Sequence, residues 1–284
     1  MLYNLVGSTI SYSSSAAWNT ERRSKLLLPL IFGILLIVPI QAYLAGLFFN
    51  GSANYLNYFT RITDLSGYDG AFTPGQLWFL LFLFVISLIC LPLMVWYKKK
   101  GKGTLGSNVP LILVVLMGLL PCIGSLLKIG GKSPTEDMAY FLLGFFFLTS
   151  DKLLSKLEKY RFILLGLSVA YAIFTTFVLQ RLLFEVASWL AILTLLGLGK
   201  RYLNFRRTIT GYISKSSFGI YIFHQSWIVI AAFFIFKITD SPYLQIPLIF
   251  LSVIILTYVT YEACRRTPVT RWMFGLKKMI QPIV

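Results

Sequence analysis

The sequence predicts an all-α protein, a polytopic bundle of about eight transmembrane helices with both termini on the cytoplasmic side. Two properties of the 284-residue chain point to this class, because 57% of its residues are hydrophobic and only 13% are charged. An ordinary soluble domain has roughly 45–50% apolar and about 25% charged residues. The third observation is a succession of apolar stretches along the chain, since a helical crossing needs about 20 such residues.

Eight apolar stretches are the candidates for these helices. The fourth, MAYFLLGFFFLTS, is short for a full crossing, so it extends into its flanks, thins the bilayer locally or re-enters. In chain order the stretches lie at 26–49, 77–97, 109–128, 138–150, 162–180, 183–199, 217–237 and 244–263.

The basic residues favour this count and this orientation. If the segment ERRSK at 21–25 is cytoplasmic, eight crossings return the C-terminus to the cytoplasm, and 21 of the 26 lysines and arginines fall on that side. The net charge of +16 is then mainly a topology signal, strengthened by attraction to anionic headgroups. Nucleic-acid binding is not expected, because the basic clusters lie at span ends. On the far side lie Arg61, Lys128, Lys132, Arg181 and Lys237.

The three cysteines and the N-terminus suggest no redox or metal chemistry and no cleaved leader. Cys90, Cys122 and Cys264 are widely separated and form no CxxC motif, so we interpret them as packing residues. With a single histidine in the chain, the usual ligand spacings for zinc or iron cannot be assembled. Residues 1–18 have no basic n-region, which is untypical of a signal peptide and looks more like the tail of something longer.

The stretch SFGIYIFHQSW at 217–227 contains that histidine, His224. If the helix begins near Ser217, His224 lies about 10 Å along it, below the lipid surface. An ionisable group at that depth is by default a functional hypothesis, but a neutral imidazole can also simply hydrogen-bond a neighbouring helix. The polar neighbours favour a bundle interior or a wet cavity; they are Ser216, Ser217, Gln225 and Ser226.

Two further places carry candidate residues together with structural explanations. In DGAFTPGQLWFLLFLF at 69–84, Gln76 and Trp78 follow a Pro-Gly pair at the start of a span, where helix breakers and interfacial tryptophans are ordinary. Glu185 follows Arg181 at a spacing of four residues, which permits a structural ion pair near the end of the sixth stretch.

Three segments in this order, ERRSKLLLPLIFGILLIVPIQAYL, DGAFTPGQLWFLLFLF and SFGIYIFHQSW, resemble the membrane acyltransferase 3 family, multi-span bacterial enzymes that acylate sugars and glycans. The resemblance covers about residues 4 to 265, although the intervening spans match only in hydropathy. It implies one integral-membrane domain over 1–284, lacking the family's first one or two spans, in the bacterial cell membrane.

The resemblance also implies the chemistry and the site. An acyl group passes from a cytoplasmic acyl donor, typically acyl-CoA as co-substrate with no bound cofactor, to a hydroxyl of a sugar or glycan at the membrane. His224 is the expected catalytic base, since histidine titrates in the useful range. Arg22 and Arg23 could pair with the donor's phosphates, although positive-inside charge explains them equally well. Substrate contacts are expected at Gln225, Gln76, Trp78 and Glu185, and membrane lipids are the remaining partners.

Two departures from the family pattern keep other functions open. The histidine-bearing first span of the family is absent, and Gln76 stands where the Gly-His-Leu-Trp-Phe-Leu form of the motif has histidine. Glutamine donates hydrogen bonds but is no base at neutral pH. The alternatives are a non-catalytic membrane subunit and a carrier or flippase-like protein for an envelope glycan or a lipid-linked precursor.

Overall fold

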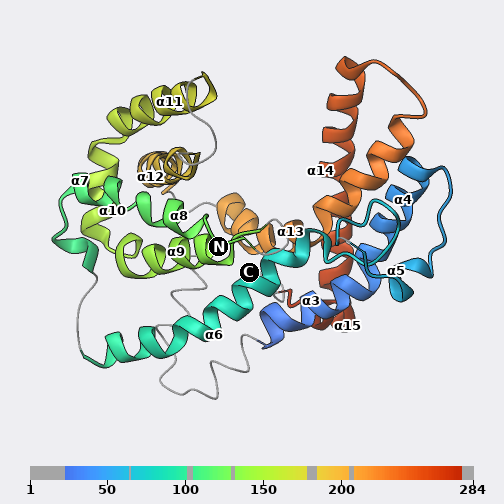
Figure 1. The fold of residues 1–284 in the computed structure, drawn as a ribbon, viewed down its shortest axis with the longest axis horizontal. Coiled ribbons are helices and arrows are strands. Elements are labelled where there is room, and N and C mark those ends of the chain that lie inside the picture. The colour runs from blue at the N-terminus through green and yellow to red at the C-terminus, as the bar shows by residue number, and fades with distance from the viewer. Residues whose placement is uncertain are drawn as a thin grey trace. The chain divides into compact units, whose positions relative to one another are not determined.

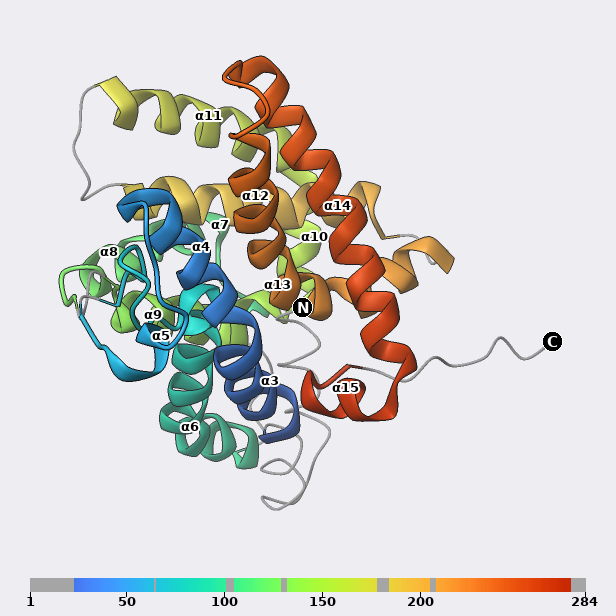
Figure 2. The same ribbon diagram turned by 90° about the vertical axis from the view of Figure 1, so that its right-hand side faces the viewer.

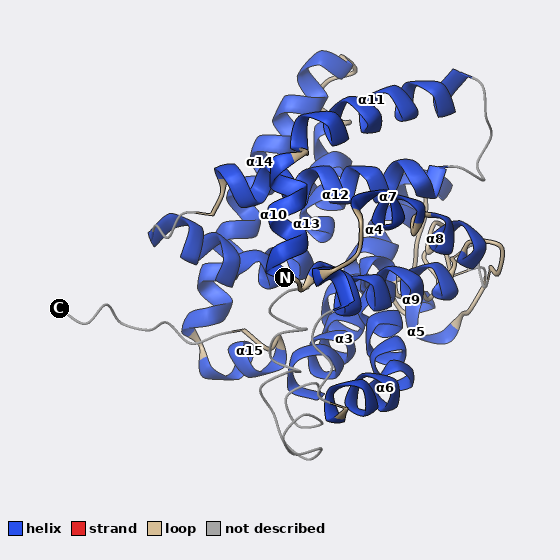
Figure 3. Ribbon diagram, turned by 90° about the vertical axis from the view of Figure 1, so that its left-hand side faces the viewer, coloured by secondary structure: helices blue, strands red, loops and turns tan. Residues whose placement is uncertain are grey.

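A computed structural model describes residues 23–63, 65–100, 105–128, 132–177, 184–204 and 208–276. Regular structure in these ranges is helical throughout, and no strand occurs in them (Figure 3). The predicted all-α class is therefore confirmed. The described chain divides into two compact units, one made of residues up to Phe84 and from Thr208 onward, the other of the residues from Val85 to 207.

The first unit begins with one long, interrupted helix. Two π-helical turns, Arg23–Leu27 and Gly33–Ile37, alternate with α3 (Leu28–Phe32) and α4 (Val38–Asn50). Each α segment starts with a proline within its first two positions. Because proline lacks an N–H group and crowds the carbonyl four residues earlier, a regular α-helical turn cannot continue through it, and the wide π turns lie at these places.

The rest of the first unit comprises helices from both halves of the sequence. After the short α5 (Asn57–Thr60), a 3₁₀ turn at Gly75–Leu77 leads into α6 (Trp78–Lys99). From the C-terminal part come α13 (Thr208–Ile235), α14 (Pro242–Arg266) and α15 (Pro268–Met273), all labelled in Figure 1. Figure 2 shows α4, α13 and α14 beside one another, and α13 contacts both of its neighbours.

The second unit consists mostly of shorter helices. Ser133 caps α9 (Pro134–Leu143) and Ser150 caps α10 (Asp151–Lys159), each accepting a hydrogen bond from the backbone N–H three residues later. Besides the later part of α6, the helices are α7 (Leu111–Leu116), α8 (Leu119–Gly124), α9 (Pro134–Leu143), α10 (Asp151–Lys159), α11 (Arg161–Phe177) and α12 (Phe184–Tyr202), with a 3₁₀ turn at Leu105–Ser107 and a π-helical turn at Gly144–Leu148.

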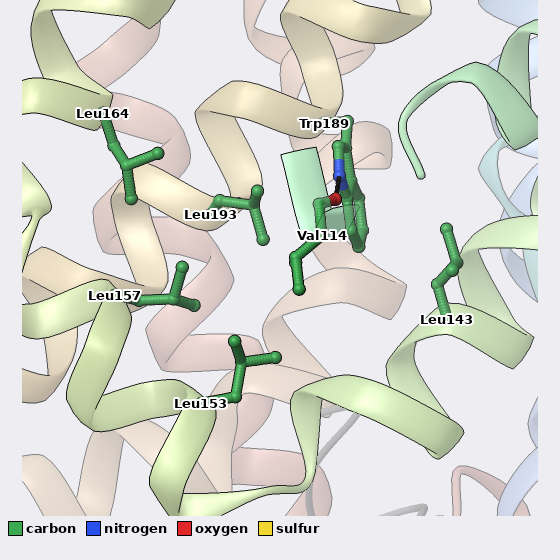
Figure 4. Packing of buried hydrophobic residues seen from close by; sticks show 7 residues of the cluster. All are labelled: Val114, Leu143, Leu153, Leu157, Leu164, Trp189 and Leu193. Carbon is green, nitrogen blue, oxygen red and sulfur yellow. Dashed lines mark hydrogen bonds between the residues drawn. The ribbon is translucent and has the colours of Figure 1, made fainter. Parts of the chain in front are cut away.

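The core of the second unit gathers around Trp189. Its indole Nε1 donates a hydrogen bond to the carbonyl oxygen of Val114 over 2.8 Å, which joins α12 to α7 (Figure 4). A Cβ atom at Gly118 would lie 2.6 Å from the indole, so a glycine is needed at the break between α7 and α8. The buried members of this core are Val114, Leu143, Leu153, Leu157, Leu164, Trp189 and Leu193.

Four helices in the described ranges are long and apolar enough to cross a membrane, namely Lys25–Asn50, Gly75–Tyr97, Thr210–Ile235 and Pro242–Arg266. A fifth candidate is the pair Pro134–Leu148 and Asp151–Lys159, which bends by 95°. These four match the first, second, seventh and eighth predicted spans. The stretch 109–128 is divided between α7 and α8, and α11 has 17 residues. Eight crossings and two cytoplasmic termini thus stay predictions.

Candidate functional site

Hydrogen bonds in the first unit join α4, the 3₁₀ turn before α6, and α13. The Gln41 amide nitrogen donates to Gln76 Oε1 over 3.1 Å and to Ser226 Oγ over 2.6 Å. Gln76 Nε2 donates to the carbonyl oxygen of Ile222 over 2.8 Å, and the Tyr221 hydroxyl donates to the Gln76 carbonyl oxygen over 2.5 Å. We call the side chains of Gln41, Gln76, Tyr221 and Ser226 the glutamine cluster.

A non-helical segment, residues 70–74, brings Gln76 into this cluster by running along α4. Near its start, a Cβ atom at Gly46 would lie 3.2 Å from the backbone of Gly70. Directly after it, Gly75 begins the 3₁₀ turn with a φ of +51°, and its Cβ position is 3.3 Å from Gln41 Oε1. Irregular backbone among membrane helices is tolerated where it is buried in protein, and Ala71 and Thr73 of this segment are buried.

The backbone and side chains around this segment satisfy its polar groups. The Phe72 N–H donates to the Arg61 carbonyl, and Thr73 Oγ1 accepts from the Gly75 N–H over 3.1 Å. The Tyr58 hydroxyl lies 2.9 Å from the carbonyl oxygens of both Ile34 and Thr73. Tyr58 is 1% exposed, and this burial raises the pKa of its hydroxyl well above the ordinary value. Tyr58 therefore stays a neutral donor that anchors the segment.

His224 lies farther along its helix than the sequence predicts. The helix α13 begins at Thr208 rather than near Ser217, because the polar start TITGYISKS continues the helix. His224 is therefore about 21 Å along the candidate span from Thr210, near the middle of its 26 residues.

The imidazole of His224 has a defined tautomer. Its Nδ1 lies 3.1 Å from the Ile220 carbonyl oxygen and 2.9 Å from the Tyr221 carbonyl oxygen. A carbonyl only accepts, so Nδ1 carries the proton and Nε2 of the neutral ring has the lone pair. Nε2 has no hydrogen-bond partner among the described residues, and the ring is half-buried. The arrangement supplies a proton acceptor within a membrane helix.

The structure does not bring His224 into the glutamine cluster. Residues advance by about 100° around an α-helix, so His224 is turned by about 160° from both Ile222 and Ser226, which face Gln76 and Gln41. Gln225 is turned by about 60° from Ile222, at the edge of that contact, and its amide bonds to no described residue. Tyr221 links His224 to the glutamine cluster, because its hydroxyl donates to the Gln76 carbonyl oxygen while its own carbonyl oxygen accepts from His224 Nδ1.

The other predicted site residues lie in different settings. Trp78 is the first residue of α6, two positions after Gln76, with its ring 5.4 Å from that of Phe82. Glu185 belongs to the second unit, in the first turn of α12, where its Oε2 is buried without a hydrogen-bond partner among the described residues. Its predicted partner Arg181 lies outside the described residues.

The predicted donor-binding arginines stay open to test. Arg22 lies outside the described residues, and Arg23 begins the first π-helical turn with its side chain outside them. Cys90 and Cys122 are buried, Cys264 is half-buried, and all three are free thiols. Within the described ranges, no group of three or more metal-ligating side chains could hold an ion.

The sequence analysis missed Gln41 and Tyr221. Gln41 is the polar residue in LLIVPIQAYL and is 6% exposed, so a buried amide within a span was the available signal. Nothing local distinguishes Tyr221 from the other tyrosines of this aromatic-rich chain, since its role depends on a residue 145 positions away.

The long apolar helices with polar side chains among them define a helical membrane protein. Residues 2–262 match the acyltransferase 3 family, described as an acyltransferase domain, and the chain belongs to this family. No curated protein and no solved structure matches the chain.

Proposed function

We propose that this protein is an integral-membrane O-acyltransferase that transfers an acyl group from acyl-CoA to a hydroxyl of a sugar or glycan. Membership of the acyltransferase 3 family supports the reaction class. The observation that carries the proposal is His224, whose Nδ1 is bonded to its own helix while Nε2 keeps a lone pair. We place the protein in a bacterial cell membrane, as a multi-pass protein that takes its donor from the cytoplasm.

In the proposed reaction, His224 Nε2 accepts the proton of the sugar hydroxyl while the hydroxyl oxygen attacks the thioester carbonyl. The tetrahedral intermediate then collapses, the carbon–sulfur bond breaks, and the imidazolium returns the proton to the leaving thiolate. The products are an ester on the sugar and free coenzyme A. The Nδ1 hydrogen bonds keep the base in the required tautomer and orientation.

The glutamine cluster would act as the support of this base. It ties the turn before α6 to α13 at Ile222 and Ser226, within two residues of His224. In this proposal Gln225 and Trp78 contact the acceptor, and Arg22 and Arg23 bind the phosphates of the donor. The guanidinium group suits this role because it binds phosphate oxygens bidentately.

One observation favours a second candidate, a non-catalytic membrane subunit with the same fold. Both ends of the Gln76 amide are engaged within the chain, Nε2 with the Ile222 carbonyl and Oε1 with Gln41. In this candidate Gln76 holds helices together and takes no part in a reaction.

Replacing His224 distinguishes the two candidates. We expect His224→Ala to lower acyl transfer by roughly 10²- to 10⁴-fold, the contribution of a positioned general base. The measurement is incorporation of labelled acetyl from acetyl-CoA into envelope glycans by membranes that contain the protein. Ser217→Ala is the matched control, because Ser217 lies on the same helix and bonds only to the Ser214 carbonyl.

The comparison requires that the His224→Ala and wild-type proteins are inserted into the membrane in comparable amounts. Transfer by His224→Ala at the wild-type rate would remove His224 from the mechanism. Absence of transfer by the wild-type chain in cells that lack other acyltransferases would favour the subunit.

A further inference from the structure

We propose that a pocket between the carboxyl ends of α4 and α13 binds an anionic phospholipid, with the lipid phosphate on Lys237 and the beginning of an acyl chain against phenylalanine rings. The pocket has a volume of about 280 Å³ and lies within the first unit. It is lined by Leu47, Phe48, Gly51, Phe233, Phe236 and Lys237. This binding is independent of acyl transfer.

The walls of the pocket are apolar and poorly covered by the protein. The rings of Phe48 and Phe236 come from α4 and from the turn after α13, with centroids 5.8 Å apart. Phe48 is 50% exposed and Phe236 is 39% exposed. Apolar rings exposed side by side are stabilised by contact with hydrocarbon, which an acyl chain supplies.

One charge lies at the rim of the pocket. The Lys237 Nζ is 4.1 Å from the centroid of the Phe233 ring, and no carboxylate in the described part of the chain forms an ion pair with it. The nearest acidic residue in sequence, Asp240, is exposed and makes no such pair. The lysine therefore offers an unneutralised positive charge beside apolar rings, which complements a phosphate with an attached acyl chain.

The position along the helices fits a lipid rather than a soluble ligand. The candidate spans end at Asn50 and Ile235, so the pocket lies where hydrocarbon gives way to headgroups. Its volume is just below the roughly 300–1,000 Å³ of a pocket that encloses a whole small molecule, so it takes only part of a lipid. Gly51 adopts φ +71° and places no side chain over the pocket.

Lipid titration of the full chain tests the proposal. The purified protein in detergent is titrated with dioleoyl phosphatidylglycerol and, separately, with dioleoyl phosphatidylcholine, and bound lipid is counted by native mass spectrometry. We expect about fivefold tighter binding of phosphatidylglycerol, the effect of one lysine near a membrane surface. Lys237→Gln should reduce this preference to less than twofold, whereas Arg61→Gln should preserve it, because the exposed Arg61 does not line the pocket.

A second variant tests the apolar part of the proposed lipid site. Leu47→Trp places a larger side chain into the pocket and should weaken binding of both lipids by several fold. Equal affinity of the wild type for the two lipids, or an unchanged preference in Lys237→Gln, would overturn the proposal. An equal loss of the preference for phosphatidylglycerol in Lys237→Gln and Arg61→Gln would overturn the proposal, because it would show that the preference arises from general surface charge. Displacement of the lipid by soluble glycerol phosphate would show headgroup recognition without an acyl-chain site.

Discussion

Gln41 joins three elements of the first unit through one amide nitrogen. Its Nε2 donates to Gln76, 35 residues away, and to Ser226, 185 residues away. Gln41 and Ser226 are both buried, so Ser226 cannot exchange this donor for bulk water. A single side chain thus fixes the register between α4, the turn before α6 and α13.

Substitution of Gln41 should destabilise the first unit. Gln41→Leu keeps the approximate volume but leaves Gln76 Oε1 and Ser226 Oγ without their donor. We expect a loss of about 1–3 kcal/mol in the free energy of unfolding, the penalty for an unsatisfied buried polar group. Denaturant titration of the purified protein in detergent, followed by tryptophan fluorescence, measures it.

Gln225→Leu is the matched control for Gln41→Leu. The Gln225 amide has no hydrogen bond to a described residue, so its replacement should leave the free energy of unfolding unchanged within about 0.5 kcal/mol. In the proposed function it should instead raise the KM for the acceptor. Equal stability of the two variants would mean that the Gln41 hydrogen bonds contribute nothing net.

At the scale of helices, close packing in the second unit depends on a small residue in α12. A Cβ atom at Gly197 would lie 2.5 Å from the Leu157 carbonyl oxygen and 2.9 Å from its carbon, so α10 and α12 are in backbone contact there. At Gly199, two residues later on the same helix, nothing lies within 4 Å of the Cβ position. Replacing each glycine by alanine therefore distinguishes the effect of close packing, at Gly197, from the effect of helix propensity alone, at Gly199.

We expect Gly197→Ala to destabilise the second unit by about 1–3 kcal/mol, because the backbone of α10 must move to admit a methyl group. Gly199→Ala should be neutral or stabilising by up to about 1 kcal/mol, since alanine is the better helix former. Thermal unfolding of the two variants in the same detergent is the measurement. A Gly197→Ala protein as stable as Gly199→Ala would contradict the close contact.

The motif DGAFTPGQLWFLLFLF shows what local sequence can predict about an element. Its Pro-Gly pair correctly indicates that a helix begins just afterwards, since α6 starts at Trp78. The course of residues 70–74 along α4 was not predictable in this way. It depends on Gly46 and Gly70 allowing two backbones to approach, and these glycines are 24 positions apart in the sequence.

For the whole molecule, charge distribution predicts sidedness. Basic residues concentrate in the loops expected on the cytoplasmic side, and eight crossings produce that arrangement. The described helices supply four candidate spans, or five with the bent pair, so the remaining crossings depend on the shorter helices of the second unit.

Single-cysteine labelling tests this topology. In a chain with Cys90, Cys122 and Cys264 replaced, we expect Lys132→Cys to react with a membrane-impermeant maleimide in intact cells. Lys102→Cys should react only after permeabilisation, because it lies in a loop predicted to be cytoplasmic. Labelling of both positions from the same side would exclude the third predicted crossing, residues 109–128.

The membrane class and the main helices could be predicted from the amino-acid sequence, because transfer into lipid depends on each segment's own side chains. The sequence also singles out His224, since an imidazole in an apolar span is conspicuous without knowledge of its neighbours. Tertiary structure decided which polar groups meet. Gln41, Gln76 and Ser226 come together from distant segments. Gln76 bonds to α13 at Ile222, two residues before His224. These contacts arise from the packing of helices against one another, which no local pattern of residues encodes.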